Sequence, residues 1–259
     1  MTYVFDPANW EWLITGNNLR FILEGFAINL EIAIVSMLLS LVFGLLLALG
    51  RLSRFAPLSI MAGLWVDVWR NLPLIFIILY LALSIPSRWR TTYEDLIPGF
   101  FPEALQSGRV LAAIMGLVLY NSAMLAEIMR AGILSLDRGQ GEAARALGMS
   151  YRQSMRLVIL PQGLRRMVPA TVSQLITLNK DTTLVSIVAI QAVMRNGRIV
   201  TGFNFFGGVQ APVLQVFIFV GALFIAVNLL LSRISRRLEV RESRRTSARA
   251  KIQVAGAET

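Results

Sequence analysis

Long hydrophobic runs, separated by shorter polar stretches, make up most of this chain. A helix that crosses the hydrocarbon core of a bilayer needs about 20 predominantly apolar residues. The runs that reach this length are Phe26–Gly50, Pro57–Pro86, Arg109–Leu136, Met167–Ile190 and Pro212–Ser232. The pattern therefore predicts an all-α, polytopic membrane protein with about five transmembrane helices.

Two of these runs are interrupted by polar residues. The second contains Asn71 and Pro73. Because proline lacks an N–H donor and clashes with the preceding turn, we expect a kink or break there. The fourth run carries the polar segment Asn179–Thr183 in its middle. Interrupted helices in transporters direct their ends toward substrate near the midplane, so both places are candidates for substrate contact. The polar, proline-containing stretch Ser87–Gly108 predicts a loop after the second run.

Composition supports a membrane protein and excludes several kinds of chemistry. Hydrophobic residues make up 56% of the chain and charged residues only 15%, whereas soluble domains are about a quarter charged. The chain has no cysteine and no histidine, which excludes disulfides, thiolate chemistry, haem ligation and histidine-based metal sites. The first twelve residues contain no Lys or Arg, so we do not expect a cleaved signal peptide.

Basic residues are distributed unevenly between the two predicted faces. The net charge of +10 would suggest a nucleic-acid partner in a soluble chain. Here 17 of the 25 Lys and Arg lie in Arg51–Arg54, Arg130–Arg166 and the segment from Arg233 onward. With five crossings these segments share one face, and cytoplasmic loops collect Lys and Arg. We therefore expect the N-terminus outside, the C-terminus inside, and no nucleic-acid partner.

This topology divides the chain into three parts. Residues 1–25 are expected to form an extracytoplasmic segment, and residues 26–232 a transmembrane domain. Residues 233–259 form a basic cytoplasmic tail, which we expect to anchor the topology and to contact anionic membrane lipid.

An unusually charged loop joins the third and fourth runs. Gly139 and Gly141 are expected to break the preceding helix, and Glu142 to lie in the first turn of a short helix, where a carboxylate meets the positive end of the helix dipole. Gly148 permits the turn that ends this helix. A second helix then follows, capped by Ser150 and terminated or kinked by a proline, Pro161.

This loop resembles the loop motif of ATP-binding-cassette (ABC) importer permeases. The match consists of Glu142-Ala143-Ala144, Gly148 and Val158-x-Leu160-Pro161 at fixed spacing, with Val158 where the family usually has Ile. The segments WRNLPL (69–74), AEIMRAGILSLDRGQGEAARALGMS (126–150), LPQGLRRMVP (160–169) and KDTTLVS (180–186) resemble polar amino acid permeases, most closely those for glutamate/aspartate and glutamine. Asn71-Leu72 replaces the frequent Gly-Thr of that family.

The resemblance implies a type I ABC importer permease fold in a bacterial inner (plasma) membrane. It implies a polar amino acid substrate, a second permease chain in a homo- or heterodimer, two cytosolic ABC ATPases and an extracytoplasmic binding protein. The cytoplasmic coupling loop would span about 137–166. The residues implied to contact the ATPase are Glu142, Ala143, Ala144, Gly148, Leu160 and Pro161. The chain lacks the GxxxxGK[ST] loop that cradles phosphates, so ATP would be hydrolysed by a partner; we expect neither a cofactor nor an enzymatic activity of its own.

Polar residues inside the runs have two interpretations. Glu127 and Arg130 are three apart, as are Asp67 and Arg70, so each pair can neutralise itself on one helix face. Alternatively, such residues line a path for a zwitterionic amino acid, which needs a cation for its carboxylate and acceptors for its ammonium group. The candidate path residues are Arg70, Asn71, Asn121, Ser122, Glu127, Asn179, Lys180, Thr182 and Thr183.

Other functions fit less well. A secondary amino acid transporter driven by a proton or sodium gradient would usually show paired repeats, and five crossings without internal repeats fit that class poorly. A membrane enzyme or an assembly scaffold has no catalytic constellation to support it.

Overall fold

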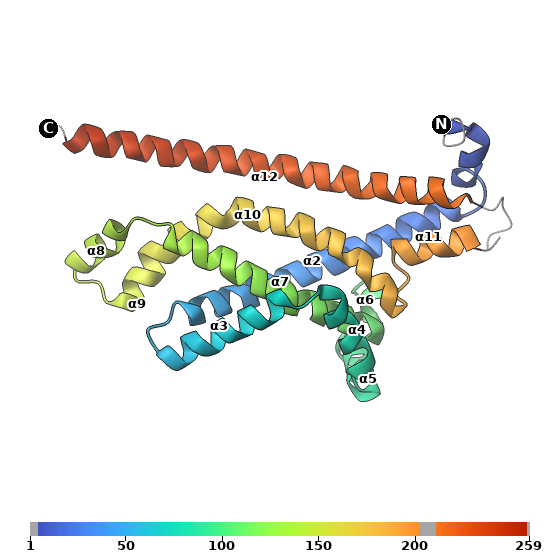
Figure 1. The fold of residues 1–259 in the computed structure, drawn as a ribbon, viewed down its shortest axis with the longest axis horizontal. Helices are drawn as coiled ribbons and strands as arrows, with labels where there is room; N and C mark the ends of the chain where they lie inside the picture. Colours follow the sequence, from blue (N-terminus) through green and yellow to red (C-terminus); the bar gives the residue numbers. More distant parts are fainter. Residues whose placement is uncertain (1–4, 203–210, 258–259) are drawn as a thin grey trace.

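The computed structural model describes residues 5–202 and 211–257, with side chains on the last helix described to residue 240. Its regular structure is helical throughout these residues (Figure 1). The helices long and apolar enough to cross a membrane singly are α2 (Asn18–Arg51), α7 (Gly108–Leu134) and the first part, Val213–Val240, of α12 (Val213–Ala257). Two bent helix pairs raise the number of candidate spans from three to five.

The first bent pair is formed by α3 (Ala56–Asn71) and α4 (Leu74–Ser84), whose axes differ by 99°. Leu72 is extended (ψ 136°), as the residue before a proline prefers, and Pro73 is the N-cap residue of α4. The side-chain amide of Asn71 donates to the carbonyl of Asp67 at 2.6 Å. The break expected from the sequence is confirmed.

The second bent pair follows the polar segment of the fourth run. Helix α10 (Leu160–Asp181) continues into the 3-10 helix η3 (Thr182–Val188), the chain bends after the left-handed Ala189 (φ 62°), and α11 (Val193–Gly202) follows. The two arms differ by 52°. The break expected at Asn179–Thr183 lies later in the chain: the α-helix changes to a 3-10 helix at Thr182, and the bend comes at residues 189–192. Helix α11 was not expected.

The interior is built around α7, which packs along α2 and against α4. Small residues allow this close approach, as they do between helices in membranes generally. A Cβ added to Gly44 of α2 would lie 2.9 Å from the Cβ of Leu125 in α7. A Cβ added to Gly116 of α7 would lie 2.8 Å from Cγ1 of Ile78 in α4. Side chains at these points would force the helices apart.

Several boundaries differ from those expected. Helix α2 begins eight residues before Phe26, because the segment Asn18–Gly25 contributes the buried apolar side chain of Ile22. The short 3-10 helix η1 (Pro7–Leu13) precedes α2. The expected loop 87–108 contains α5 (Ser87–Leu96) and α6 (Glu103–Gln106). Helix α12 runs without a break through the start of the basic tail. Residues 1–4, 203–210 and 258–259 of the three predicted parts lie outside the described residues.

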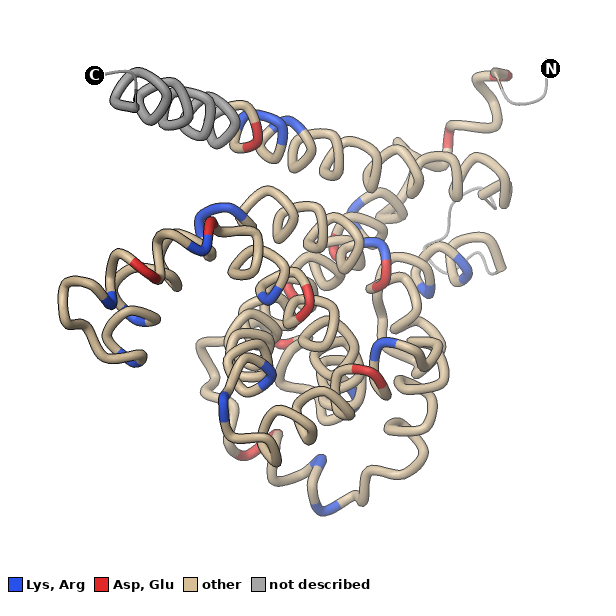
Figure 2. The backbone as a smooth tube through the Cα atoms, turned by 60° about the vertical axis from the view of Figure 1, so that its left-hand side comes forward, with Lys and Arg blue, Asp and Glu red and all other residues tan. Residues whose placement is uncertain are grey.

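The three basic segments lie toward one end of the molecule. In Figure 1 the α2–α3 turn, the segment with α8 (Arg138–Ala146) and α9 (Tyr151–Ser154), and the C-terminal part of α12 all lie toward the left, whereas η1 and α11 lie toward the right. Figure 2 shows the N-terminal part of α12 free of charged residues, with Lys and Arg appearing only toward its C-terminal part. This grouping is what the predicted topology requires.

Candidate functional site

Helix α8 begins differently from the expectation. Its N-cap is Asp137, whose side chain accepts a hydrogen bond from the Gly139 amide at 2.8 Å. Gly139 and Gly141 therefore lie inside α8 and do not break the preceding helix. Glu142 lies in the second turn of α8, not the first, because the carboxylate of Asp137 already occupies the capping position.

The end of α8 follows the sequence-based expectation. Gly148 is left-handed (φ 77°), its amide donates to Arg145 at 2.9 Å, and the amide of Met149 donates to Ala144 at 3.1 Å. This pair of hydrogen bonds is the Schellman arrangement that closes many helices. A Cβ on Gly148 would meet no atom within 4 Å, so glycine is required here for its conformation and not for space.

The following helix is capped as expected but not terminated. Ser150 and Gln153 form a capping box at the start of α9. A π-helical segment, η2 (Met155–Ile159), then leads directly into α10, in which Pro161 is one of the first residues. The expectation that Pro161 ends this helix is wrong, because helical residues continue from α9 through η2 into α10. Pro161 is the second residue of α10, just after the π-helical segment.

The α8–α9 hairpin (residues 138–154) is fastened to the α2–α3 turn and presents apolar groups outward. The Tyr151 hydroxyl donates to the Leu52 carbonyl at 3.3 Å, and the Arg54 guanidinium lies 4.2 Å from the centre of the Tyr151 ring. Ala144 is buried, whereas Glu142, Ala143 and Ala146 are exposed and Leu147 is 79% exposed. Such a rim of small and apolar side chains can fit into a groove of another protein.

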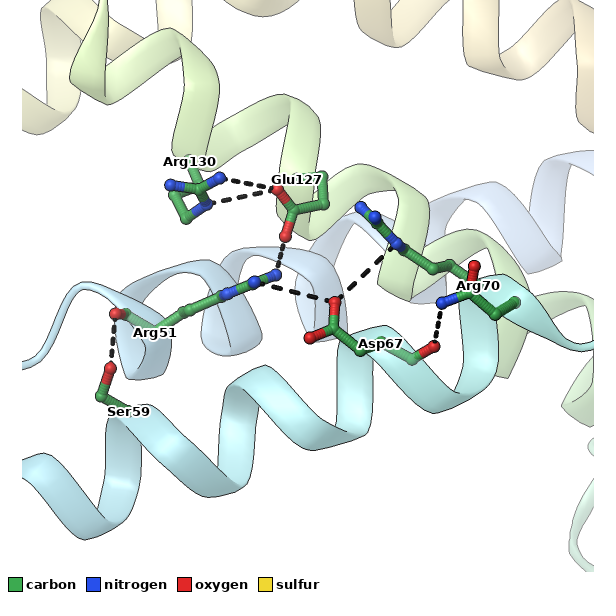
Figure 3. A network of polar contacts seen from close by, with 7 residues as sticks. Arg51, Ser59, Asp67, Arg70, Glu127 and Arg130 are labelled. Atoms are coloured by element: carbon green, nitrogen blue, oxygen red, sulfur yellow. Dashed lines mark hydrogen bonds and ion pairs between the residues drawn. The ribbon is translucent and has the colours of Figure 1, made fainter.

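An ion-pair cluster joins α2, α3 and α7 near the same end (Figure 3). Glu127 of α7 accepts from Arg130 at 2.9 and 3.2 Å and pairs with Arg51 of α2. Arg51 also lies 3.7 Å from Asp67 of α3, which lies 3.8 Å from Arg70. Both intrahelical pairs expected from the sequence form. Arg51, which links them, was missed, although its place at the end of α2 before a short turn was a usable signal.

Four of the candidate path residues are buried inside the chain. Asn121 accepts from Gln174 at 2.8 Å, and its own amide donates to Leu117 within α7. Ser122 is buried beside it. Asn179 donates to Asn228 of α12 at 3.0 Å, and Thr182 is bonded to α2.

The remaining candidates reach the surface of the isolated chain. Asn71 and Lys180 are exposed, Thr183 is half-exposed, and the side chain of Arg70 is 40% exposed. Glu127, by contrast, is held between two arginines, which matches the structural interpretation of this residue.

Helix α10 carries an exposed polar stripe that sequence reasoning missed. Ser173, Thr177 and Lys180 are all exposed, while Gln174 and Leu178 between them are buried. Spacings of four and three residues put the stripe residues on one helix face. That spacing was visible in the sequence, but nothing there showed which face of α10 packs inward.

The architecture and the loop can be compared with known proteins. Residues 40–241 match the family described as "Binding-protein-dependent transport system inner membrane component". The chain belongs to this family. The permease is therefore a multi-pass inner-membrane component of a binding-protein-dependent transport system, as the loop motif indicated.

Curated relatives cover nearly the whole permease. It is 37% identical over 226 residues to a probable glutamine ABC transporter permease protein, GlnP, of Bacillus subtilis, covering 87% of this chain and 95% of the relative. It is 32% identical over 232 residues to the glutamate/aspartate import permease protein GltK of Escherichia coli, covering 88% and 98%. An arginine transport system permease protein, ArtQ, of Bacillus subtilis is also 32% identical, over 231 residues, covering 89% and 96%.

Solved structures share the fold. A crystal structure described as an amino acid ABC transporter with histidines aligns with a TM-score of 0.69 at 25% identity, covering 86% of the permease and 94% of that chain. A chain of the MetNI methionine ABC transporter in an inward-facing conformation aligns with a TM-score of 0.58, covering 90% and 98%; at 21% identity it supports the fold alone.

Proposed function

We propose that this permease imports a polar amino acid, with glutamine, glutamate and aspartate as the preferred substrates. The support is the similarity to permeases named for these amino acids over nearly the whole chain. Arg70 and Lys180 provide cations on candidate spans that could face a substrate carboxylate. Because one relative is named an arginine transport system permease protein, a basic amino acid is the competing substrate class.

In this proposal the permease is one subunit of a larger transporter complex. A second permease chain, identical or related, completes the pathway, and an extracytoplasmic binding protein delivers the amino acid. Two cytosolic ATPases supply the energy, since the sequence has no phosphate-cradling loop. The N-terminus lies outside and the C-terminus inside, as the grouping of basic residues favours.

The α8–α9 hairpin is the proposed contact with the ATPase. The observation that supports this contact is the left-handed Gly148 beside the exposed rim. Replacing Gly148 by Val should misplace that rim, since a left-handed residue with a side chain costs about 1–2 kcal/mol, or about tenfold in binding. Gly148→Asn is the matched control, because Asn tolerates this conformation. ATP hydrolysis and uptake by the reconstituted complex, with membrane levels quantified, give the readout. Normal coupling in Gly148→Val would mean that the hairpin is only a connector.

The polar stripe of α10 is the proposed lining of the pathway. Exposure of Ser173, Thr177 and Lys180 to lipid would be costly, because charged and polar groups in spans face a cavity or another helix. A water-filled path between two permease chains satisfies these groups. Three of the buried candidates, Asn121, Asn179 and Thr182, then serve as bonds between helices, and the path uses the exposed ones.

Thiol labelling tests this lining without background, since the chain contains no cysteine. Cysteines at Ser173 and Thr177 should react with a charged, water-soluble thiol reagent, and substrate should slow the reaction. Leu38→Cys is the control, because Leu38 is exposed on α2 among apolar neighbours and should react only with a lipid-soluble reagent. If Ser173→Cys and Thr177→Cys behave like Leu38→Cys, α10 faces lipid and the proposed lining is wrong.

A further inference from the structure

A single buried side chain in α2 holds both sides of the break between α10 and α11. Asn29 is completely buried. Its amide nitrogen donates to the carbonyl of Thr182 at 2.9 Å and lies 3.0 Å from the Thr182 hydroxyl oxygen. Its amide oxygen accepts from the backbone N–H of Val193 at 2.9 Å. Thr182 is the first residue of η3, which continues α10, and Val193 is the first residue of α11, after the bend at residues 189–192.

The backbone N–H of Val193 needs a partner because α11 begins at this residue. The first N–H groups of a helix have no acceptor within it, and an unsatisfied backbone group inside a membrane protein is costly. An asparagine amide carries both a donor and an acceptor without any charge. Asn29 can therefore serve a carbonyl on one side of the break and an N–H on the other.

Helix α11 is also docked on the same face of α2. Asn196 donates through its side-chain amide to the carbonyl of Phe21 at 2.7 Å. Between these contacts lies Gly25, where an added Cβ would be 2.6 Å from the amide nitrogen of Asn196. Phe21, Gly25 and Asn29 are spaced by four residues and form one face. The position of α11 is thus set from α2, across the break.

We propose that Asn29 is a positioning residue for transport. By holding Thr182 it determines where the exposed Lys180 and the half-exposed Thr183 stand in the pathway. This inference rests on the proposed function of α10 as pathway lining. Asn29 is itself shielded from the pathway and acts only through the residues that it holds.

The test compares thiol reactivity at a site that Asn29 should position with reactivity at a site that it should not affect. Cysteine is placed at Thr183, next to Thr182, or at Thr177, six residues earlier, in the otherwise cysteine-free chain. The assembled transporter is then labelled with a charged thiol reagent with Asn29 intact or replaced by Leu. We expect Asn29→Leu to change the labelling rate of Thr183→Cys by about tenfold, since more than 1 kcal/mol of bonding is lost. The rate of Thr177→Cys should stay within about twofold.

A matched control separates positioning from stability. Gln174→Leu removes another buried amide bond of α10, the one to Asn121 of α7, away from the break. It should lower the melting temperature about as much as Asn29→Leu while leaving both labelling rates and the substrate KM for uptake unchanged. Asn29→Leu should also raise that KM. Asn29→Ser, which is neutral and smaller, should shift labelling in the same direction if the Leu variant does not reach the membrane.

The outcomes distinguish the two proposals. If Asn29→Leu and Asn29→Ser lower the melting temperature but leave Thr183→Cys labelling and the KM unchanged, Asn29 is merely structural and the inference is overturned. If Thr177→Cys and Thr183→Cys fail to react with intact Asn29, the pathway lining is wrong instead.

Discussion

The two broken spans are made in different ways. The α3–α4 break is local: Pro73 removes a donor, Leu72 is extended, and the Asn71 side chain bonds back to Asp67 one turn earlier. The α10–α11 break contains no proline between Asp181 and Val193. Its backbone groups are satisfied by an asparagine 153 residues from one and 164 from the other.

The difference shows what keeps each break in place. The first is encoded in a few adjacent residues. Helix α3 is then tied to Arg51 of α2 by a partly exposed ion pair, and Arg51 in turn pairs with Glu127 of α7 (Figure 3). The second is held by neutral, buried amides that exist only when α2 is packed beside both helices. A change in α2 should therefore disturb the second break more than loss of an ion pair disturbs the first.

The largest effect is expected from Gly25→Ala. Its Cβ would lie 3.0 Å from the Cα of Val193 as well as against Asn196, so α11 must move. Overpacking of this kind costs about 1–3 kcal/mol, enough to lower the melting temperature by several degrees. Gly221→Ala in α12 is the control, because its Cβ would meet nothing within 4 Å. Equal melting temperatures for the two variants would show that α11 is not docked closely on α2.

A smaller effect is expected from Glu127→Gln. This change leaves Arg51 and Arg130 adjacent without their shared carboxylate, at side-chain exposures of 20–32% for the three residues. The cost should lie between that of exposed and fully buried pairs, about 1–2 kcal/mol. Thermal unfolding in detergent and the KM of uptake are measured together. Glu24→Gln, which removes an exposed pair with Arg20, should change neither.

The same variant distinguishes the two interpretations of Glu127. A bracing role predicts a lower melting temperature with the KM nearly unchanged. A raised KM at an unchanged melting temperature would mean that Glu127 binds substrate.

Much of the fold followed from hydrophobic runs and local chemistry. The spans, the proline break and the capping box at Ser150 depend on residues close in sequence. Helix α11 was missed because its ten residues include Arg195 and Arg198 and form no long apolar run. The start of α8 was wrong because the cap at Asp137 outweighed the flexibility of Gly139 and Gly141.

The candidate sites likewise separate into those that local sequence predicts and those that depend on packing. The α8–α9 hairpin was located from a fixed spacing of residues, and the left-handed Gly148 was correctly expected. The roles of Asn29 and Arg51 were not expected, because a single polar residue in or beside an apolar run gives no sign of its distant partner. Which polar residues of α10 point outward likewise depends on packing.

The central claim is ATP-driven import of a polar amino acid, and uptake into proteoliposomes tests it most directly. The permease is reconstituted with its ATPase, and labelled glutamine, glutamate or aspartate is added with the binding protein outside. We expect uptake to require both ATP and the binding protein, and each of the three amino acids to inhibit uptake of the other two. Uptake driven by a proton or sodium gradient without ATP hydrolysis, or uptake of another substrate class with no amino acid competition, would contradict the account.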